Sequence, residues 1–240
     1  MSGVLVMSYY HDLKNTMTEE KKKNAKNDYF AFYIGRPLSY ILTVPFLQLN
    51  IKPNFVSILS TVEVIFASVV LSVSYNVKIA VIGWLLFFLW NLLDGVDGNI
   101  ARLKKISTDL GSVYDAMSGY AAMFLFFFSA GIYAFNISDN KYAYIQIIIG
   151  AISGMAELFP RLVMHKAKNE VGNASNIKSV ADKSNFGALK KMALNITSIS
   201  GMVQPFLLIA IIFNCVPFFN SIYFIINVSV MVVSIYKILK

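Results

Sequence analysis

Six apolar stretches, each about as long as a bilayer is thick, follow one another along most of this chain and leave little choice of fold. They cover residues 54–74, 78–102, 108–134, 142–165, 197–215 and 217–238. A helix needs about 20 predominantly apolar residues to cross the hydrocarbon core. Hydrophobic residues make up 57% of the chain and charged residues only 14%. The sequence therefore predicts an all-α, polytopic membrane protein with six transmembrane helices in one domain.

Two segments precede the first predicted span. Residues 1–29 are polar and rich in lysine, without a leading apolar core, so we expect a cytoplasmic segment rather than a cleaved signal. Residues 30–53 are apolar but contain Arg36, Pro37 and Pro45. Burying an arginine in lipid is costly, which favours an interfacial amphipathic helix over a kinked span. The six-span domain then occupies residues 54–240.

The positive charges are distributed very unevenly across the predicted membrane. Of the 21 lysine and arginine residues, all but Lys78 and Lys141 fall on the side of the N-terminus. Cytoplasmic loops of membrane proteins carry this excess. We therefore expect a multi-pass protein of the cell inner (cytoplasmic) membrane, with both termini cytoplasmic. The net charge of +8 then reflects topology, and nucleic acid is not an expected partner.

Carboxylates inside two adjacent spans mark the candidate site. Asp94 and Asp97 fall in the last turns of the second predicted span, and Asp115 lies about two turns into the third. Ionisable groups at this depth are costly and are retained mainly where function needs them. Positions 94, 97, 98 and 101 follow helical spacing, as do 111 and 115, so each set forms a stripe on one helix face. The two stripes predict one pocket near the cytoplasmic side, so we expect the active site there.

The residue types in these stripes suit a diphosphate. Three carboxylates would repel one another unless a cation lay between them, and hard oxygen ligands select Mg²⁺ or Mn²⁺. Gly98 and Gly111 remove side chains where a phosphate or a flat base could approach closely. Arg102 supplies a planar fork that fits phosphate oxygens. A metal-dependent phosphate site is therefore the predicted chemistry.

The spacing D-x2-D-G-x2-A-R-x8-G-x3-D resembles the signature of the CDP-alcohol phosphotransferase (CDP-alcohol phosphatidyltransferase) family. The matching residues are Asp94, Asp97, Gly98, Ala101, Arg102, Gly111 and Asp115. The wider chain is similar too, with an interfacial helix, a Pro-Asn pair opening the first span, six spans, and the motif across spans two and three.

The resemblance implies an enzyme, an integral membrane transferase that moves a phosphate-linked alcohol from a CDP-alcohol donor to an acceptor hydroxyl and releases CMP. Such activity belongs to phospholipid or related surface-polymer biosynthesis, with membrane lipids as surroundings and a homodimer as the expected assembly. The implied metal ligands for Mg²⁺ or Mn²⁺ are Asp94, Asp97 and Asp115. The implied nucleotide contacts are Gly98, Ala101, Arg102 and Gly111.

One position departs from the family signature. The signature continues with a further aspartate, implied to be a metal ligand and the base for the acceptor hydroxyl, where this chain has Gly119. Catalysis could use a base from elsewhere or none, because loose phosphoryl-transfer transition states need little early deprotonation. Alternatively the chain is a catalytically inactive CDP-alcohol-binding or regulatory membrane protein. In a third interpretation a different metal arrangement serves a larger acceptor, such as a sugar.

Three titratable residues are candidates for the missing base. Asp109 also suits the first turn of a helix, Glu157 also suits an ion pair with Arg161 one turn later, and His165 also suits a solvated interface. Arg161 ends the fourth predicted span on the side of the site, where it could bind an anionic acceptor. Residues 166–196 are polar and are expected to form a flexible cytoplasmic loop that could cover the site.

Overall fold

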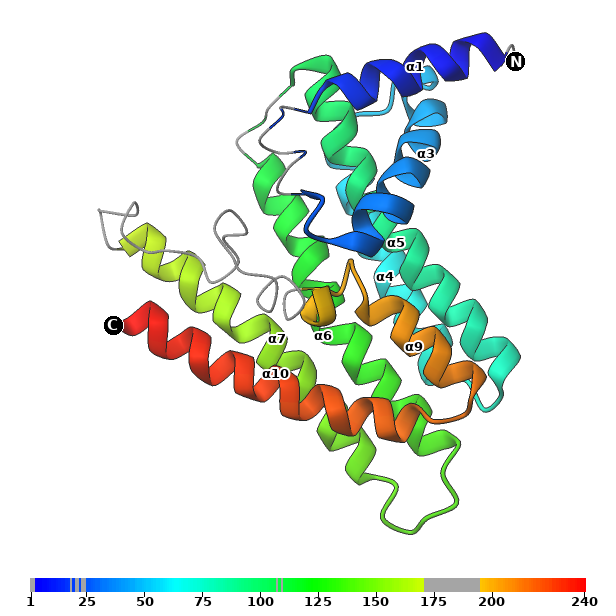
Figure 1. Ribbon diagram of the computed structural model, residues 1–240, viewed down its shortest axis with the longest axis vertical. Helices are drawn as coiled ribbons and strands as arrows, with labels where there is room; N and C mark the ends of the chain where they lie inside the picture. Colours follow the sequence, from blue (N-terminus) through cyan, green and yellow to red (C-terminus); the bar gives the residue numbers. More distant parts are fainter. Residues whose placement is uncertain are drawn as a thin grey trace.

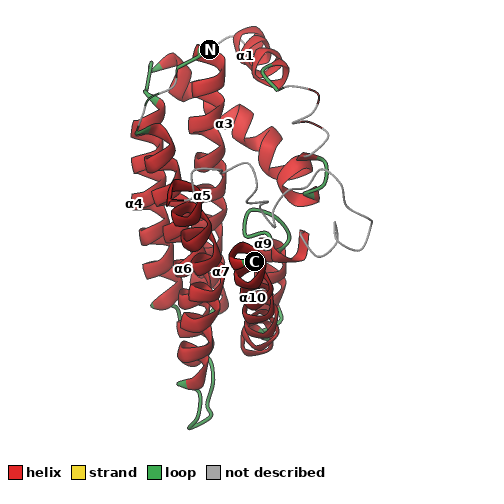
Figure 2. Cartoon of the chain, turned by 90° about the vertical axis from the view of Figure 1, so that its left-hand side faces the viewer, coloured by secondary structure: helices red, strands yellow, loops and turns green. Residues whose placement is uncertain are grey.

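The computed structural model describes residues 3–17, 19, 22, 25–106, 108, 110–170 and 195–240. Within these ranges the chain is helical and contains no strand (Figure 2). The elements are α1 (Gly3–Asn15), the π-helical turn η1 (Ala31–Gly35), α3 (Arg36–Gln48), α4 (Pro53–Ser72), α5 (Val77–Lys104), α6 (Gly111–Asn136), α7 (Ile145–Glu170), α9 (Val203–Ile212) and α10 (Val216–Leu239).

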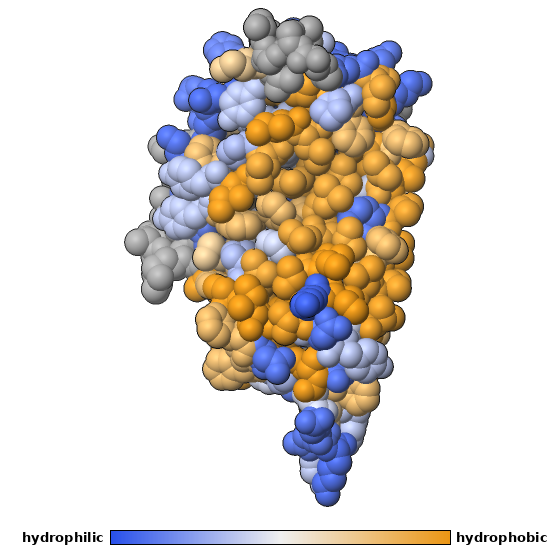
Figure 3. Space-filling view, turned by 90° about the vertical axis from the view of Figure 1, so that its right-hand side faces the viewer, coloured by the Kyte–Doolittle hydropathy of each residue, from blue (hydrophilic) through white to orange (hydrophobic). Residues whose placement is uncertain are grey.

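Five helices are long and apolar enough to cross a membrane, namely α4, α5, α6, α7 and α10. Their outer faces are apolar: Ile65, Phe66 and Val69 of α4, for example, are exposed. The face in Figure 3 is hydrophobic over most of its height and hydrophilic at both ends. Such a surface suits lipid, since a bundle in water would bury these side chains. The prediction of an all-α integral membrane protein is confirmed.

The predicted span at residues 197–215 is not one membrane-length helix. Its helical part, α9, has 10 residues, about 15 Å at 1.5 Å per residue, or half the hydrocarbon core. A turn comes first, in which the Gly201 N–H donates to the Ser198 carbonyl at 2.9 Å. The Ser198 hydroxyl in turn donates to the Asp28 carboxylate at 2.8 Å. Six full spans are therefore not confirmed.

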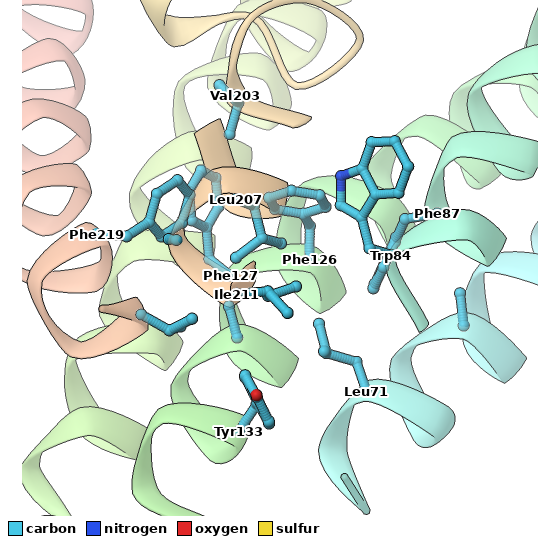
Figure 4. Packing of buried hydrophobic residues seen from close by; sticks show 14 of the residues in the cluster. Leu71, Trp84, Phe87, Phe126, Phe127, Tyr133, Val203, Leu207, Ile211 and Phe219 are labelled. Atoms are coloured by element: carbon cyan, nitrogen blue, oxygen red, sulfur yellow. The ribbon is translucent and has the colours of Figure 1, made fainter. Parts of the chain in front are cut away.

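Helix α9 is nevertheless part of the core of the bundle. Val203, Leu207 and Ile211 are fully buried, and Figure 4 shows them beside Phe126 and Phe127 of α6. A helix that packs on other helices along one face needs no match to the bilayer thickness where its ends are satisfied by protein. Hydropathy alone does not register where a helix begins and ends, so it predicted a full span at residues 197–215.

Hydrogen bonds give the relative directions of the helices. Ser60 pairs with Ser118 at 2.8 Å, and Asn136 donates to the Ser72 carbonyl at 2.7 Å, so α4 and α6 run parallel. Likewise Asn220 bonds Gln146 and Asn227 bonds Ser153, so α7 and α10 run parallel (Figure 1). The chain must therefore return to the far end of the bundle between Glu170 and Val216, and α9 is the described part of that return.

The segment predicted as an interfacial helix contains η1 and α3, which lie at the end of the bundle where α4 begins and α5 ends (Figure 1). Helix α3 packs closely on α5, since a Cβ at Gly95 would lie 3.0 Å from the Ser39 hydroxyl. Helix α1, which falls in the predicted polar segment, packs on α3 through an edge contact of Tyr10 with Tyr40. The position of α3 at the membrane interface stays a prediction.

Glycines allow α6 and α7 to approach each other closely. A Cβ at Gly150 would lie 2.5 Å from the Phe127 carbonyl oxygen, and one at Gly154 would lie 2.6 Å from that of Phe124. Small residues at helix contacts are how membrane helices gain close packing without a hydrophobic driving force.

Gly150→Ala is therefore expected to destabilise the bundle by about 1–3 kcal/mol, because the added methyl group meets a backbone atom that cannot rotate away. The measurement is the thermal unfolding midpoint of the detergent-solubilised protein. Gly119→Ala is the matched control, since a Cβ there meets nothing within 4 Å. Equal midpoints for the two variants would contradict the close approach.

Candidate active site

A cavity of about 600 Å³ lies where α3, α4, α5 and the start of α6 meet. The structure brings all seven motif residues into its lining, namely Asp94, Asp97, Gly98, Ala101, Arg102, Gly111 and Asp115. The stripe on α5 and the stripe on α6 thus face one space. The role of each residue there stays a prediction.

The three aspartates share this cavity without a cationic partner at contact distance. Asp94 lies close enough to Asp97 and Asp115 for their charges to repel. Over the described part of the chain, the ion pairs within 4.0 Å involve none of the three. Carboxylates brought together in this way suit a hard divalent cation.

As the side chains stand, however, they do not converge on one point. No group of three acidic, histidine or cysteine side chains among the described residues is arranged to hold a metal ion. Asp97 is buried and already bonded: one oxygen accepts from the Ser57 hydroxyl at 2.5 Å, and the other accepts from the Gly98 N–H. The donor set fits the cation by its chemistry, and binding would require these side chains to rotate.

Arg102 is held in place by a chain of hydrogen bonds that ends on α3. Its Nη2 donates to Asn99 Oδ1 at 2.7 Å, and Asn99 Nδ2 donates to the Thr43 hydroxyl at 3.0 Å and to Ser39 at 3.3 Å. A Cβ at Gly98 would lie 3.0 Å from Arg102 Nη1, so the glycine leaves room for the guanidinium. Such support fixes the fork before a ligand arrives. The sequence analysis missed Asn99, whose signal is a polar residue one turn before Arg102 on the same helix face.

The start of α4 forms another wall of the cavity. Asn54 and Thr108 exchange hydrogen bonds at 3.1 and 3.2 Å, joining this helix to the turn before α6. A Cβ at Gly111 would lie 3.0 Å from the Thr108 hydroxyl and 3.6 Å from Asn54 Oδ1. Gly111 therefore permits the close approach of the two helix starts. The sequence analysis noted the Pro-Asn pair as a helix start, but it did not include Asn54 or Ser57 in the site.

A second connection closes the cavity from the side of α9. Asn91 of α5 donates to the Ser200 carbonyl at 3.1 Å, and both residues line the cavity. The Tyr29 N–H donates to Asn195 Oδ1 at 2.8 Å. The turn before α9 is thereby held against both the cavity and the N-terminal segment.

There is free space around Gly119, the position at which the family signature has the missing aspartate. Gly119 lies one turn after Asp115, and a Cβ there would meet nothing within 4 Å. It is not in the cavity lining, and neither are Glu157, Arg161 and His165. Asp109 lies outside the described residues. The two candidate replacement bases that the structure does describe therefore do not reach the cavity.

Arg161 and His165 both lie on α7, and Arg161 is close enough to the site for its charge to act on Asp94. Arg161 interacts electrostatically with Asp94 and with Glu157. His165 is hydrogen bonded through Nδ1 to the Tyr120 hydroxyl. Helix α7 continues to Glu170, with Lys166 and Glu170 paired at 2.7 Å, so the predicted loop at 166–196 begins later than expected. Residues 171–194 of that loop lie outside the described residues.

The fold and the cavity together define a helical membrane protein with a charged site at one end of its bundle. The family model of CDP-alcohol phosphatidyltransferase matches residues 50–233. This chain therefore belongs to the CDP-alcohol phosphatidyltransferase family, as its motif predicted. No curated protein gives a significant match. The matched range begins after α3, so α1, η1 and α3 lie outside it.

Asn99→Leu is expected to destabilise the protein by about 1–3 kcal/mol, because it removes the hydrogen bonds of Asn99 to Arg102, Ser39 and Thr43 and leaves Arg102 Nη2 without its partner. Thermal unfolding measures the change. Asn169→Leu serves as the control, since Asn169 is exposed near the end of α7. A loss no larger than that of the control would mean that the chain of hydrogen bonds contributes nothing to stability.

Proposed function

We propose that this chain transfers a phosphate-linked alcohol group from a CDP-alcohol to an acceptor hydroxyl, with release of CMP, in phospholipid or related surface-polymer biosynthesis. The observation that carries the proposal is the gathering of all seven motif residues around one cavity. Family membership supports transferase activity in general. The distribution of lysine and arginine supports a cytoplasmic site with both termini on the same side.

In this proposal Asp94, Asp97 and Asp115 hold Mg²⁺ or Mn²⁺. The ions, when bound, supply positive charge that neutralises the diphosphate and stabilises CMP as the leaving group. Arg102 binds phosphate oxygens through its planar fork, which Asn99 orients. Gly98 keeps the space that the fork needs, and Gly111 keeps the two helix starts together.

The transfer itself is a displacement at the β-phosphorus of the donor. The acceptor oxygen forms a bond to this phosphorus, the bond from phosphorus to the bridging oxygen breaks, and the electron pair leaves with CMP. The acceptor hydroxyl also loses its proton, which passes to water or to a phosphate oxygen of the departing CMP. In the described part of the chain no candidate base other than the three aspartates lines the cavity, which favours a mechanism that relies on positioning and electrostatics.

A second candidate function is favoured by Gly119 alone. Without the aspartate that the signature has at this position, the chain could bind a CDP-alcohol and report on it without turnover. The three aspartates and Arg102 would bind metal and nucleotide in either case, so binding measurements do not distinguish the two functions. The two differ in turnover.

The first test is CMP release by the purified protein in lipid with Mg²⁺ or Mn²⁺, over a panel of CDP-alcohol donors and acceptor alcohols. Asp94→Asn, Asp97→Asn and Asp115→Asn should each lower the rate by at least about a hundredfold, as expected when preorganised charge is removed from a reaction site. Asp139→Asn, at an exposed position after α6, should leave the rate unchanged. A site variant that releases CMP at the wild-type rate would show that the substituted residue is not needed for catalysis.

The Gly119→Asp variant separates the two candidate functions. The side chain should be accommodated, because a Cβ at this position meets nothing within 4 Å. We expect the wild type to release CMP and the variant to release it at least as fast, since it restores a ligand. A silent wild type with an active variant would establish the binding protein instead.

A further inference from the structure

Arg36 is a charged side chain in the cavity that does not belong to the motif. It begins α3 directly after η1, lines the cavity, and lies before the range that the family model matches. The cost of burying it in lipid predicts an interfacial position for this residue, which stays a prediction. In the structure its side chain lines the cavity.

The hydrogen bonds of Arg36 are poorly satisfied. Its Nε is buried without a partner, and its Nη1 donates at 2.7 Å to the sulfur of Met17, a weak acceptor. Throughout the described residues the ion pairs within 4.0 Å do not include it. A guanidinium has five donors, and leaving them unmatched away from water is costly. Such a group is prepared for an anionic ligand.

A second guanidinium faces the same space. Arg102 also lines the cavity and is close enough to Arg36 for the two positive charges to interact. Two cations that line one cavity repel each other unless an anion lies between them. The carboxylate whose charge acts on Arg102, Asp97, is already bonded to Ser57 and to the Gly98 N–H. The charge that would balance the two arginines is therefore expected from a ligand.

Helix α3 fixes the positions of both arginines, although Arg102 itself belongs to α5. Arg36 belongs to α3, and Ser39 and Thr43, one and two turns later, bind the Asn99 side chain that orients Arg102. The π-helical turn η1 precedes Arg36 and contributes Ala31 and Gly35 to the cavity lining. Irregular π-helical turns occur frequently at functional sites. The two forks are thus held by one element before any ligand binds.

We infer that Arg36 and Arg102 together form an anion site for the diphosphate of a nucleoside diphosphate, in which Arg36 exchanges Met17 for a phosphate oxygen. This inference rests on the proposed function, whose donor carries such a diphosphate. It makes α3 part of the donor site, although α3 lies outside the range that the family model matches. Among the described residues of the N-terminal segment, Met17 takes part through the contact that Arg36 gives up.

The test is the affinity for CDP, measured by calorimetry on the full-length protein in nanodiscs with Mg²⁺. Arg36→Gln should raise Kd by about 10- to 100-fold, the loss expected for one charge-assisted hydrogen-bonding group. Lys105→Gln, which removes an exposed charge beside the site but outside the cavity lining, should leave Kd unchanged. Met17→Leu should not weaken CDP binding, because Arg36 no longer bonds the Met17 sulfur once CDP is bound.

Cytidine, which has no phosphate, distinguishes a phosphate contact from a structural effect. In competition with CDP it should bind the wild type and Arg36→Gln equally, whereas a distorted cavity would weaken both ligands. If Arg36→Gln does not fold, the test uses Arg36→Lys instead. This variant should bind CDP several-fold more weakly than the wild type, because a point charge cannot reproduce the planar fork. Wild-type CDP affinity in the folded variant would overturn the inference and leave the proposed function standing. A wild type that does not bind CDP would overturn both.

Discussion

The free-energy cost of placing charged side chains in lipid determines how this molecule is arranged. Asp94, Asp97 and Asp115 lie on helices that cross the membrane, and such groups persist there only when they meet partners or a polar space. The structure gathers them with Arg102 and Arg36 in one cavity at the end of the bundle. The apolar core and the glycine contacts of α6 with α7 lie away from this charge. They hold the helices in the directions on which the shared cavity depends.

Helical geometry made much of the site predictable from the sequence. A stripe at i, i+3, i+4 and i+7 on one helix and a pair at i, i+4 on the next must face one space if the two helices pack as neighbours. Long apolar stretches likewise predicted the five membrane-length helices. The sixth predicted span was not confirmed at α9, because hydropathy does not register the Ser198–Gly201 turn that comes before this short helix.

Spacing along the sequence could not predict the contacts that complete the site, because they join residues of different helices. Ser57 meets Asp97 across 40 positions, and Asn99 meets Ser39 across 60. Arg36 shows a different limit. Its predicted place at the interface, which stays a prediction, rests on the free energy of the charge in lipid and in water alone. A polar cavity within the protein is a third environment, and only the packing of α3 on α5 reveals it.

The shared direction of α7 and α10 has a consequence for how the chain enters the membrane. Counting membrane-length helices gives five, an odd number that would leave the two ends of the chain on opposite sides. Because α10 runs parallel to α7, the end of α10 instead lies beside the end of α7 (Figure 1). Helix α9 is too short to hold a position across the bilayer alone, so it must enter together with α10, as a hairpin closed by the turn at Cys215.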